Sequence, residues 1–180
     1  MLSAWIRSGY NISIIQQYVI EWCQLFPRET SARYLYEQWL LAGGNPEVLF
    51  EYILAWLAEH GFEIDTGRML AALLRTGISW KRYVGPLKLW VARHKGDLEA
   101  TFFYSAWLAD SARSPSLITN AIKAWLDNHA EWKDADFLLN AWLKRGDAPT
   151  DTVRAGYDRY IVANGQSFEA VIVEAAIFPA

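Results

Sequence analysis

The residues best suited to binding chemistry in this sequence are cations gathered in one short stretch. Between Thr66 and Gly96 there is no Asp or Glu, but there are seven basic side chains: Arg68, Arg75, Lys81, Arg82, Lys88, Arg93 and Lys95. Trp80 lies directly before Lys81, in an expected turn. Guanidinium and ammonium groups pair with carboxylates or phosphates, and an indole stacks on planar groups. We predict that these cations and Trp80 form a partner-binding site.

The sequence leaves several classes of partner possible for this basic segment. The stretches before and after it each carry a net charge of −5, which the overall charge of −3 conceals. The first candidate is an acidic protein segment, which exposed helical grooves take up, and the next is another part of a longer parent chain. Nucleic acid ranks third, because the acidic flanks repel polyanions. A solvated basic face without any ligand is the alternative to all three.

Residue types that carry catalysis are present, but not in catalytic patterns. The sequence holds no glycine-rich phosphate loop, no HExxH and no CxxC. Asp134 and Asp136 fall at a predicted helix start, where carboxylates favour the positive end of the helix dipole. Cys23, the sole cysteine, occupies an apolar stripe, which predicts a buried thiol. We therefore expect no enzymatic activity, no cofactor and no metal site.

The histidines recur at intervals of 34 and 35 residues, as His60, His94 and His129, each four residues after a tryptophan. A metal ladder is one interpretation. However, equivalent positions in stacked hairpins lie about 10 Å apart, too far for the ~2 Å bonds of a shared zinc ion. We expect instead that each imidazole packs on the preceding indole and bonds the last carbonyl groups of its own helix.

A repeat marked by the tryptophans must position all of these residues. The chain has 180 residues, 53% of them apolar, and ten are Trp. Two series with steps of 34 or 35 residues include eight of the ten: Trp5, Trp39, Leu73, Trp107 and Trp142, and then Trp22, Trp56, Trp90, Trp125 and Tyr160. A turn column of the same period reads Gly9, Gly43, Gly77, Ser111 and Gly146. The predicted repeats are 12–45, 46–79, 80–113 and 114–148, with 1–11 the tail of a partial repeat and 149–180 an incomplete one.

Each repeat is predicted to hold two helices, because the apolar residues in each half follow helical spacing. The second helix ends at the glycine column, where a left-handed conformation suits glycine. Gly85 and Pro86 lie inside a first helix, so we expect that helix to kink or to begin near Pro86. Hairpins of this length stack to bury both faces. The sequence therefore predicts an all-α fold, an α-solenoid of stacked antiparallel hairpins with about ten helices, as a single domain over 1–180.

The stretch SARYLYEQWLLAGGNP, residues 31–46, together with the 34-residue period, resembles tetratricopeptide repeats. The aromatic density is similar to that of half-a-TPR repeats. The resemblance is partial, because the two tryptophan series do not fall in the register of the tetratricopeptide signature. The recurrent AWL pattern also looks like the solenoid tails of large bacterial signalling NTPases. These resemblances imply a scaffold or sensor surface.

We expect a non-catalytic protein–protein interaction or sensing module in the cytoplasm, and a piece of a larger protein. The competing class is a nucleic-acid-binding helical repeat that uses the basic segment. No apolar run reaches the ~18 residues of a membrane span. Trp5 and Gly9 match Trp39 and Gly43, and the stretch 167–180 lacks a polar capping face. These ends predict either excision from a longer solenoid or self-stacking on another copy.

Overall fold

The computed structural model describes residues 2–9 and 11–165, and these residues form helices and turns with no strand. The predicted all-α class with about ten helices is confirmed. The chain divides into two compact units, residues 1–93 and 94–180. A continuous solenoid in one domain stays a prediction, and the uncapped stretch 167–180 lies outside the described residues.

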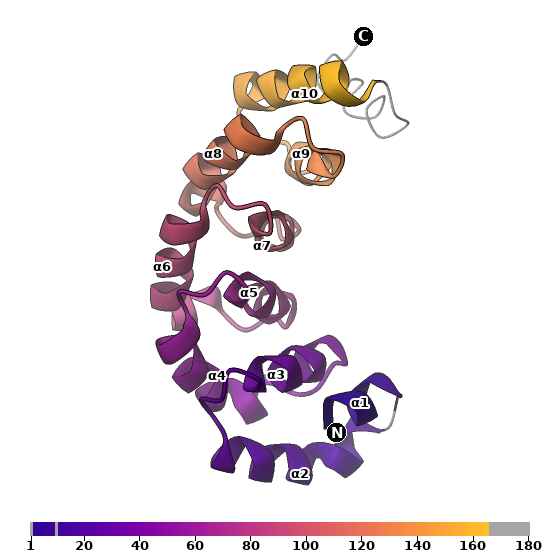
Figure 1. Ribbon diagram of the computed structural model, residues 1–180, viewed down its shortest axis with the longest axis vertical. Helices are drawn as coiled ribbons and strands as arrows, with labels where there is room; N and C mark the ends of the chain where they lie inside the picture. The colour runs from indigo at the N-terminus through magenta and orange to yellow at the C-terminus, as the bar shows by residue number, and fades with distance from the viewer. Residues whose placement is uncertain (1, 10, 166–180) are drawn as a thin grey trace. The chain divides into compact units, whose positions relative to one another are not determined.

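The first unit consists of helices that pair as antiparallel hairpins. Its elements are α1 (Leu2–Arg7), α2 (Ile12–Leu25), α3 (Ala32–Leu41), α4 (Pro46–His60), α5 (Thr66–Arg75), the 3₁₀ helix η1 (Trp80–Tyr83) and all but the last residue of α6 (Val84–His94). Helices α1, α3 and α5 lie side by side in one layer, and α2 packs beside α4 in the other (Figure 1).

The second unit repeats this arrangement. It holds α7 (Ala100–Leu108), the 3₁₀ helix η2 (Pro115–Leu117), α8 (Thr119–His129), α9 (Ala135–Leu143) and α10 (Thr150–Asn164). Helix α7 packs beside α9, and α8 packs beside α10. Each of the four complete repeats predicted from the sequence therefore contains two α-helices.

The helix boundaries predicted from proline and glycine are confirmed. Helix α6 begins at Val84, after η1, so Pro86 lies in its first turn and costs no internal hydrogen bond. Gly43 and Gly77 adopt positive φ angles of 79° and 81°, the left-handed conformation expected at a helix end. Ser111, the exception in that column, does not, since no described residue other than glycine has a positive φ.

The indole rings of both tryptophan series form the centre of each unit. Six of them are fully buried: Trp39, Trp56, Trp90, Trp107, Trp125 and Trp142. The apolar stripes predicted for the first helices are buried as well, including Cys23. Gly44 and Gly67 allow close approach, because a Cβ atom at either position would clash with the ring of Trp39 or Trp90. The tryptophan period thus coincides with the burial of large aromatic side chains in the core.

The tryptophans on the first helices also link consecutive hairpins by hydrogen bonds. Three of them donate the Nε1–H to a backbone carbonyl 27 residues earlier, in the loop inside the preceding hairpin: Trp56 to Glu29 (3.0 Å), Trp90 to Glu63 (2.9 Å) and Trp125 to Leu98 (3.2 Å). Two tryptophans on the second helices donate forward instead, Trp39 to Asn45 and Trp107 to Ser114, both at 3.0 Å. The two series therefore make different connections.

Two of the histidines also connect consecutive hairpins. The prediction that their rings bond the last carbonyl groups of their own helix is wrong. The ring of His60 stacks on Trp56 with centroids 4.9 Å apart, as expected. Its Nε2, however, contacts the carbonyl of Arg28 at 2.8 Å, and Nε2 of His129 contacts that of Gly96 at 2.7 Å. These carbonyl groups belong to the loop of the preceding hairpin. The imidazoles reach back because each first helix ends against that loop.

Candidate partner-binding surface

The predicted basic site begins on α5, where two arginines share one exposed stripe. Arg68 and Arg75 are exposed and lie two turns apart, so they project from the same side of the helix. Ala71 and Ala72 lie between them and are each 2% exposed. We call these four residues the α5 stripe. All other residues of α5, these alanines included, are buried, so the two arginines are the only described part of this helix that a partner could contact.

The cations of η1 are engaged differently. Lys81 and Arg82 are exposed, but Arg82 forms an ion pair with Glu47 and lies over the ring of Phe50, 3.9 Å from its centroid. Both contacts belong to α4. Trp80, which starts η1, is half-buried. Arg82 is thus partly neutralised within the first unit.

Lys88 and Arg93 lie on α6, in the layer of α2 and α4. Trp90 of this helix donates its indole N–H to the carbonyl of Glu63 just before α5, so that side of α6 faces α5. Lys88 precedes Trp90 by two residues and therefore points away from α5. Arg93 lies over the ring of Phe62, 5.7 Å from its centroid. Lys88 therefore does not share a face with the α5 cations, whereas Arg93 lies on the side of α6 that faces the α4–α5 loop. Lys95 lies beyond α6, in the second unit.

An exposed stripe on α9 was missed by the sequence analysis. Phe137, Asn140, Ala141 and Lys144 follow one another at helical spacing along α9 and its C-terminal residue, and we call them the α9 stripe. Together with residues at the end of α7 they line a groove of about 480 Å³, the α7–α9 groove. Its other walls are Leu108, Ala109, Ser111 and Arg145. The repeat alignment could have predicted this stripe, because Lys144 occupies the same repeat position as Arg75.

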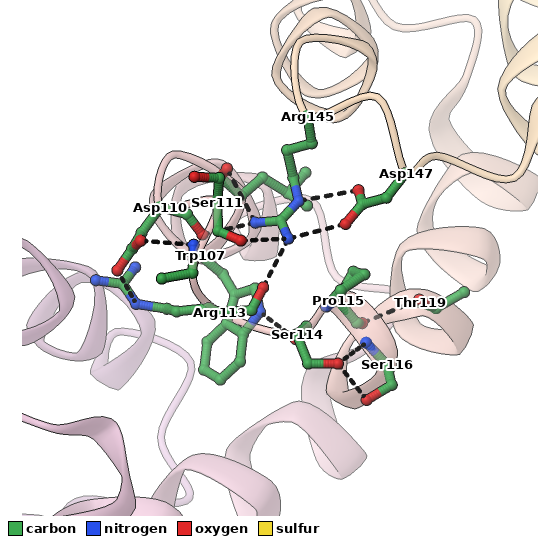
Figure 2. Close-up of polar contacts among 12 residues, drawn as sticks. Trp107, Asp110, Ser111, Arg113, Ser114, Pro115, Ser116, Thr119, Arg145 and Asp147 are labelled. Carbon is green, nitrogen blue, oxygen red and sulfur yellow. Dashed lines mark hydrogen bonds and ion pairs between the residues drawn. The ribbon is translucent and has the colours of Figure 1, made fainter.

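Arg145 fixes one wall of this groove (Figure 2). Its side chain is 4% exposed and forms an ion pair with Asp147 at 3.0 Å. The guanidinium donates hydrogen bonds to three carbonyl oxygens of the α7–α8 loop, those of Asp110 (2.7 Å), Arg113 (2.6 Å) and Ser111 (3.5 Å), and to that of Leu108 at the end of α7 (3.4 Å). This is the loop in which Ser111 replaces the column glycine. One side chain thus holds the loop whose backbone departs from the others.

The surroundings shift the pKa of several ionisable groups, among them Asp147, Cys23 and His60. The hydrogen bond from Arg145 lowers the pKa of Asp147, which keeps the carboxylate charged. Burial raises the pKa of Cys23 to about 12, so its thiol stays protonated and unreactive at neutral pH. Burial alone would lower the pKa of His60. Its hydrogen bonds to Glu63 and Arg28, with the charges of Glu63 and Glu59, outweigh burial and raise it above 6.5.

Within residues 2–9 and 11–165, no group of three or more His, Cys, Asp or Glu side chains is placed to hold a metal ion. Asp136 lies in the first turn of α9, as predicted, and its carboxylate accepts a hydrogen bond from the backbone N–H of Phe137. None of the described helices combines the length and hydropathy needed to cross a bilayer. No protein-family model, no curated protein and no solved structure matches the chain.

Proposed function

We propose that this protein is a non-catalytic protein-binding module, that α3 and α5 in the first unit and α9 in the second carry its binding surfaces, and that its partner in the first unit is an acidic protein segment. The α5 stripe carries the proposal. It presents two exposed arginines on one side of the helix, and because the alanines between them are buried, the arginines are the groups of α5 that a partner can reach. Planar guanidinium groups bind carboxylates through paired hydrogen bonds.

The spacing of the two arginines defines the segment that would fit. Arg68 and Arg75 are separated by seven residues, or about 10 Å along the helix axis. In a polyproline II segment, which has three residues per turn, side chains three residues apart lie on the same side and span about 9 Å. A polyproline II segment with carboxylates at every third residue therefore matches the α5 stripe. On the neighbouring α3, Tyr34 and Leu41 occupy the equivalent positions and are 57% and 50% exposed, which adds apolar contact area.

A charge reversal on one layer, compared with a reversal on the other, tests this proposal. The probe is a fluorescein-labelled 12-residue peptide with Glu at every third position, and its matched control carries Gln there. We expect the double variant R68E/R75E to lose binding by fluorescence anisotropy, with an unchanged thermal melt. The variant K88E, on the outward side of α6, should bind like the parent protein.

Two outcomes contradict the proposal. Equal loss of binding in K88E and R68E/R75E would mean that the effect is one of net charge rather than of the α5 stripe. Tighter binding to a 12-nucleotide single-stranded DNA than to the peptide, with a steep dependence on salt, would favour the nucleic-acid class instead.

A further inference from the structure

The α7–α9 groove lacks the negative charge that prevails in the second unit. Acidic residues outnumber basic ones in residues 94–165, yet no acidic side chain lines the groove. The nearest carboxylates are already used, because Asp110 pairs with Arg113 and Asp147 with Arg145. Lys144 is exposed at the groove and has no ion pair within the described part of the chain. The groove therefore offers an uncompensated positive charge at one end.

The rest of the α9 stripe offers an apolar wall and a pair of polar groups. Phe137 is 63% exposed and faces Leu108 and Ala109 of α7 as part of the same lining. Asn140 is half-buried between Phe137 and Lys144, and its carboxamide makes no hydrogen bond to any described residue. A carboxamide carries a donor and an acceptor, which together match the C=O and N–H of a peptide backbone.

The groove is held in shape before any partner arrives. Two residues of its wall, Leu108 at the end of α7 and Ser111 in the α7–α8 loop, accept hydrogen bonds from Arg145 through their carbonyl groups. Arg145 bonds the carbonyl groups of Asp110 and Arg113 in the same loop (Figure 2). Binding to a wall that is already ordered costs less conformational entropy than binding to a loose loop. The buried guanidinium therefore serves the groove as well as the fold.

We propose that the α7–α9 groove binds an extended peptide segment in which an apolar or aromatic side chain is followed, two or three residues later, by Asp or Glu. The apolar side chain packs against Phe137 and Leu108, the peptide backbone pairs with the carboxamide of Asn140, and the carboxylate pairs with Lys144. Phe137 and Lys144 are seven positions apart, which is a rise of about 10 Å along the helix and sets the spacing of the two anchors. This inference rests on the proposed function and specifies the partner's chemistry in the second unit.

Selection from a random 12-residue peptide display library tests the groove without a known ligand. The full chain is immobilised beside three variants: K144E, N140A and R68E/R75E. We expect the enriched peptides to share an apolar residue followed by Asp or Glu, and to bind K144E and N140A at least about tenfold more weakly than the parent chain. Binding to R68E/R75E should be unchanged. Thermal melts of all variants verify that they are folded.

The outcomes separate this inference from the function proposed for the first unit. No enrichment, a consensus without an acidic residue, or full binding to K144E overturns the groove assignment. If R68E/R75E no longer binds the glutamate peptide while K144E binds every peptide as the parent chain does, the α5 proposal is supported and the groove proposal is wrong. If only K144E and N140A lose binding, the groove stands without the α5 surface.

Discussion

The guanidinium of Arg145 donates a hydrogen bond of 2.7 Å to the carbonyl oxygen of Asp110, 35 residues earlier in the chain. Asp110 and Arg145 occupy the same position in consecutive repeats. The contact therefore joins the end of one second helix to the end of the next. It also lies beside Ser111, where the left-handed glycine of the other repeats is absent.

Replacing Arg145 with Ala should lower the free energy of unfolding by about 3 kcal/mol, because the loop carbonyls and Asp147 lose a largely buried partner. R145K keeps the charge but not the planar fork of donors, so its free energy of unfolding should lie between those of R145A and the parent protein. Urea denaturation measures both. K144A removes the adjacent exposed cation and should stay within about 0.5 kcal/mol of the parent protein. An R145A variant as stable as K144A would show that the network contributes nothing.

Trp107→Phe should cost more stability than Trp142→Phe, although both side chains are fully buried and lose the same atoms. Trp107 donates its indole N–H to the carbonyl of Ser114, whereas the N–H of Trp142 is buried with no partner in the described residues. The difference should be about 1 kcal/mol by chemical denaturation. Equal costs would mean that the indole hydrogen bonds do not stabilise the repeat.

Gly77→Ala should destabilise the protein by about 1 kcal/mol, because Gly77 has a φ of 81° that L side chains adopt at a cost. Gly85→Ala is the matched control, since a Cβ atom at either position meets nothing within 4 Å beyond its chain neighbours. Gly85 lies in α6 without a positive φ but directly before Pro86, whose ring disfavours the helical conformation for a residue with a Cβ atom, so alanine there should change the stability by less than about 0.5 kcal/mol. Thermal melts that fall equally for both variants would contradict the conformational argument.

Stability should fall as pH rises above neutrality, through His60. Its two ring nitrogens contact the carboxylate of Glu63 at 2.7 Å and the carbonyl of Arg28, both acceptors, so only the protonated ring satisfies both. Because its folded pKa lies above the ordinary 6.5, the stabilisation is complete below that pH and is lost as pH rises through the folded pKa.

The difference in stability between the parent protein and H60Q, measured by urea denaturation, should therefore shrink from pH 5.5 to pH 8.5. A difference that stays constant over this range would show that the imidazole acts only by packing.

The tryptophan and glycine positions were sufficient to predict the helices, because their period follows from packing and backbone conformation, which are local to each repeat. The partners of the indole N–H groups were not predictable. A bond from Trp56 to Glu29 depends on how one hairpin docks on the loop of another, and both residues look ordinary in the sequence.

The basic segment shows why a charge run is a weak guide to a surface. Arg75 and Lys88 are close in sequence, but they project from helices in different layers. The α9 stripe had no such run to mark it, since Phe137 and Lys144 are separated by apolar and neutral residues. Only alignment of the repeats reveals that Lys144 matches Arg75 and that Phe137 matches Tyr34.

The backward direction of the indole and imidazole bonds also sets an order of events during synthesis. The carbonyl groups of Arg28 and Glu29 receive their donors from His60 and Trp56, which the ribosome adds about 30 residues later. At 5–20 residues per second, a newly made hairpin waits roughly one to six seconds for the side chains that complete its loop. The loop of one hairpin thus gains these hydrogen bonds only after the next hairpin has been synthesised.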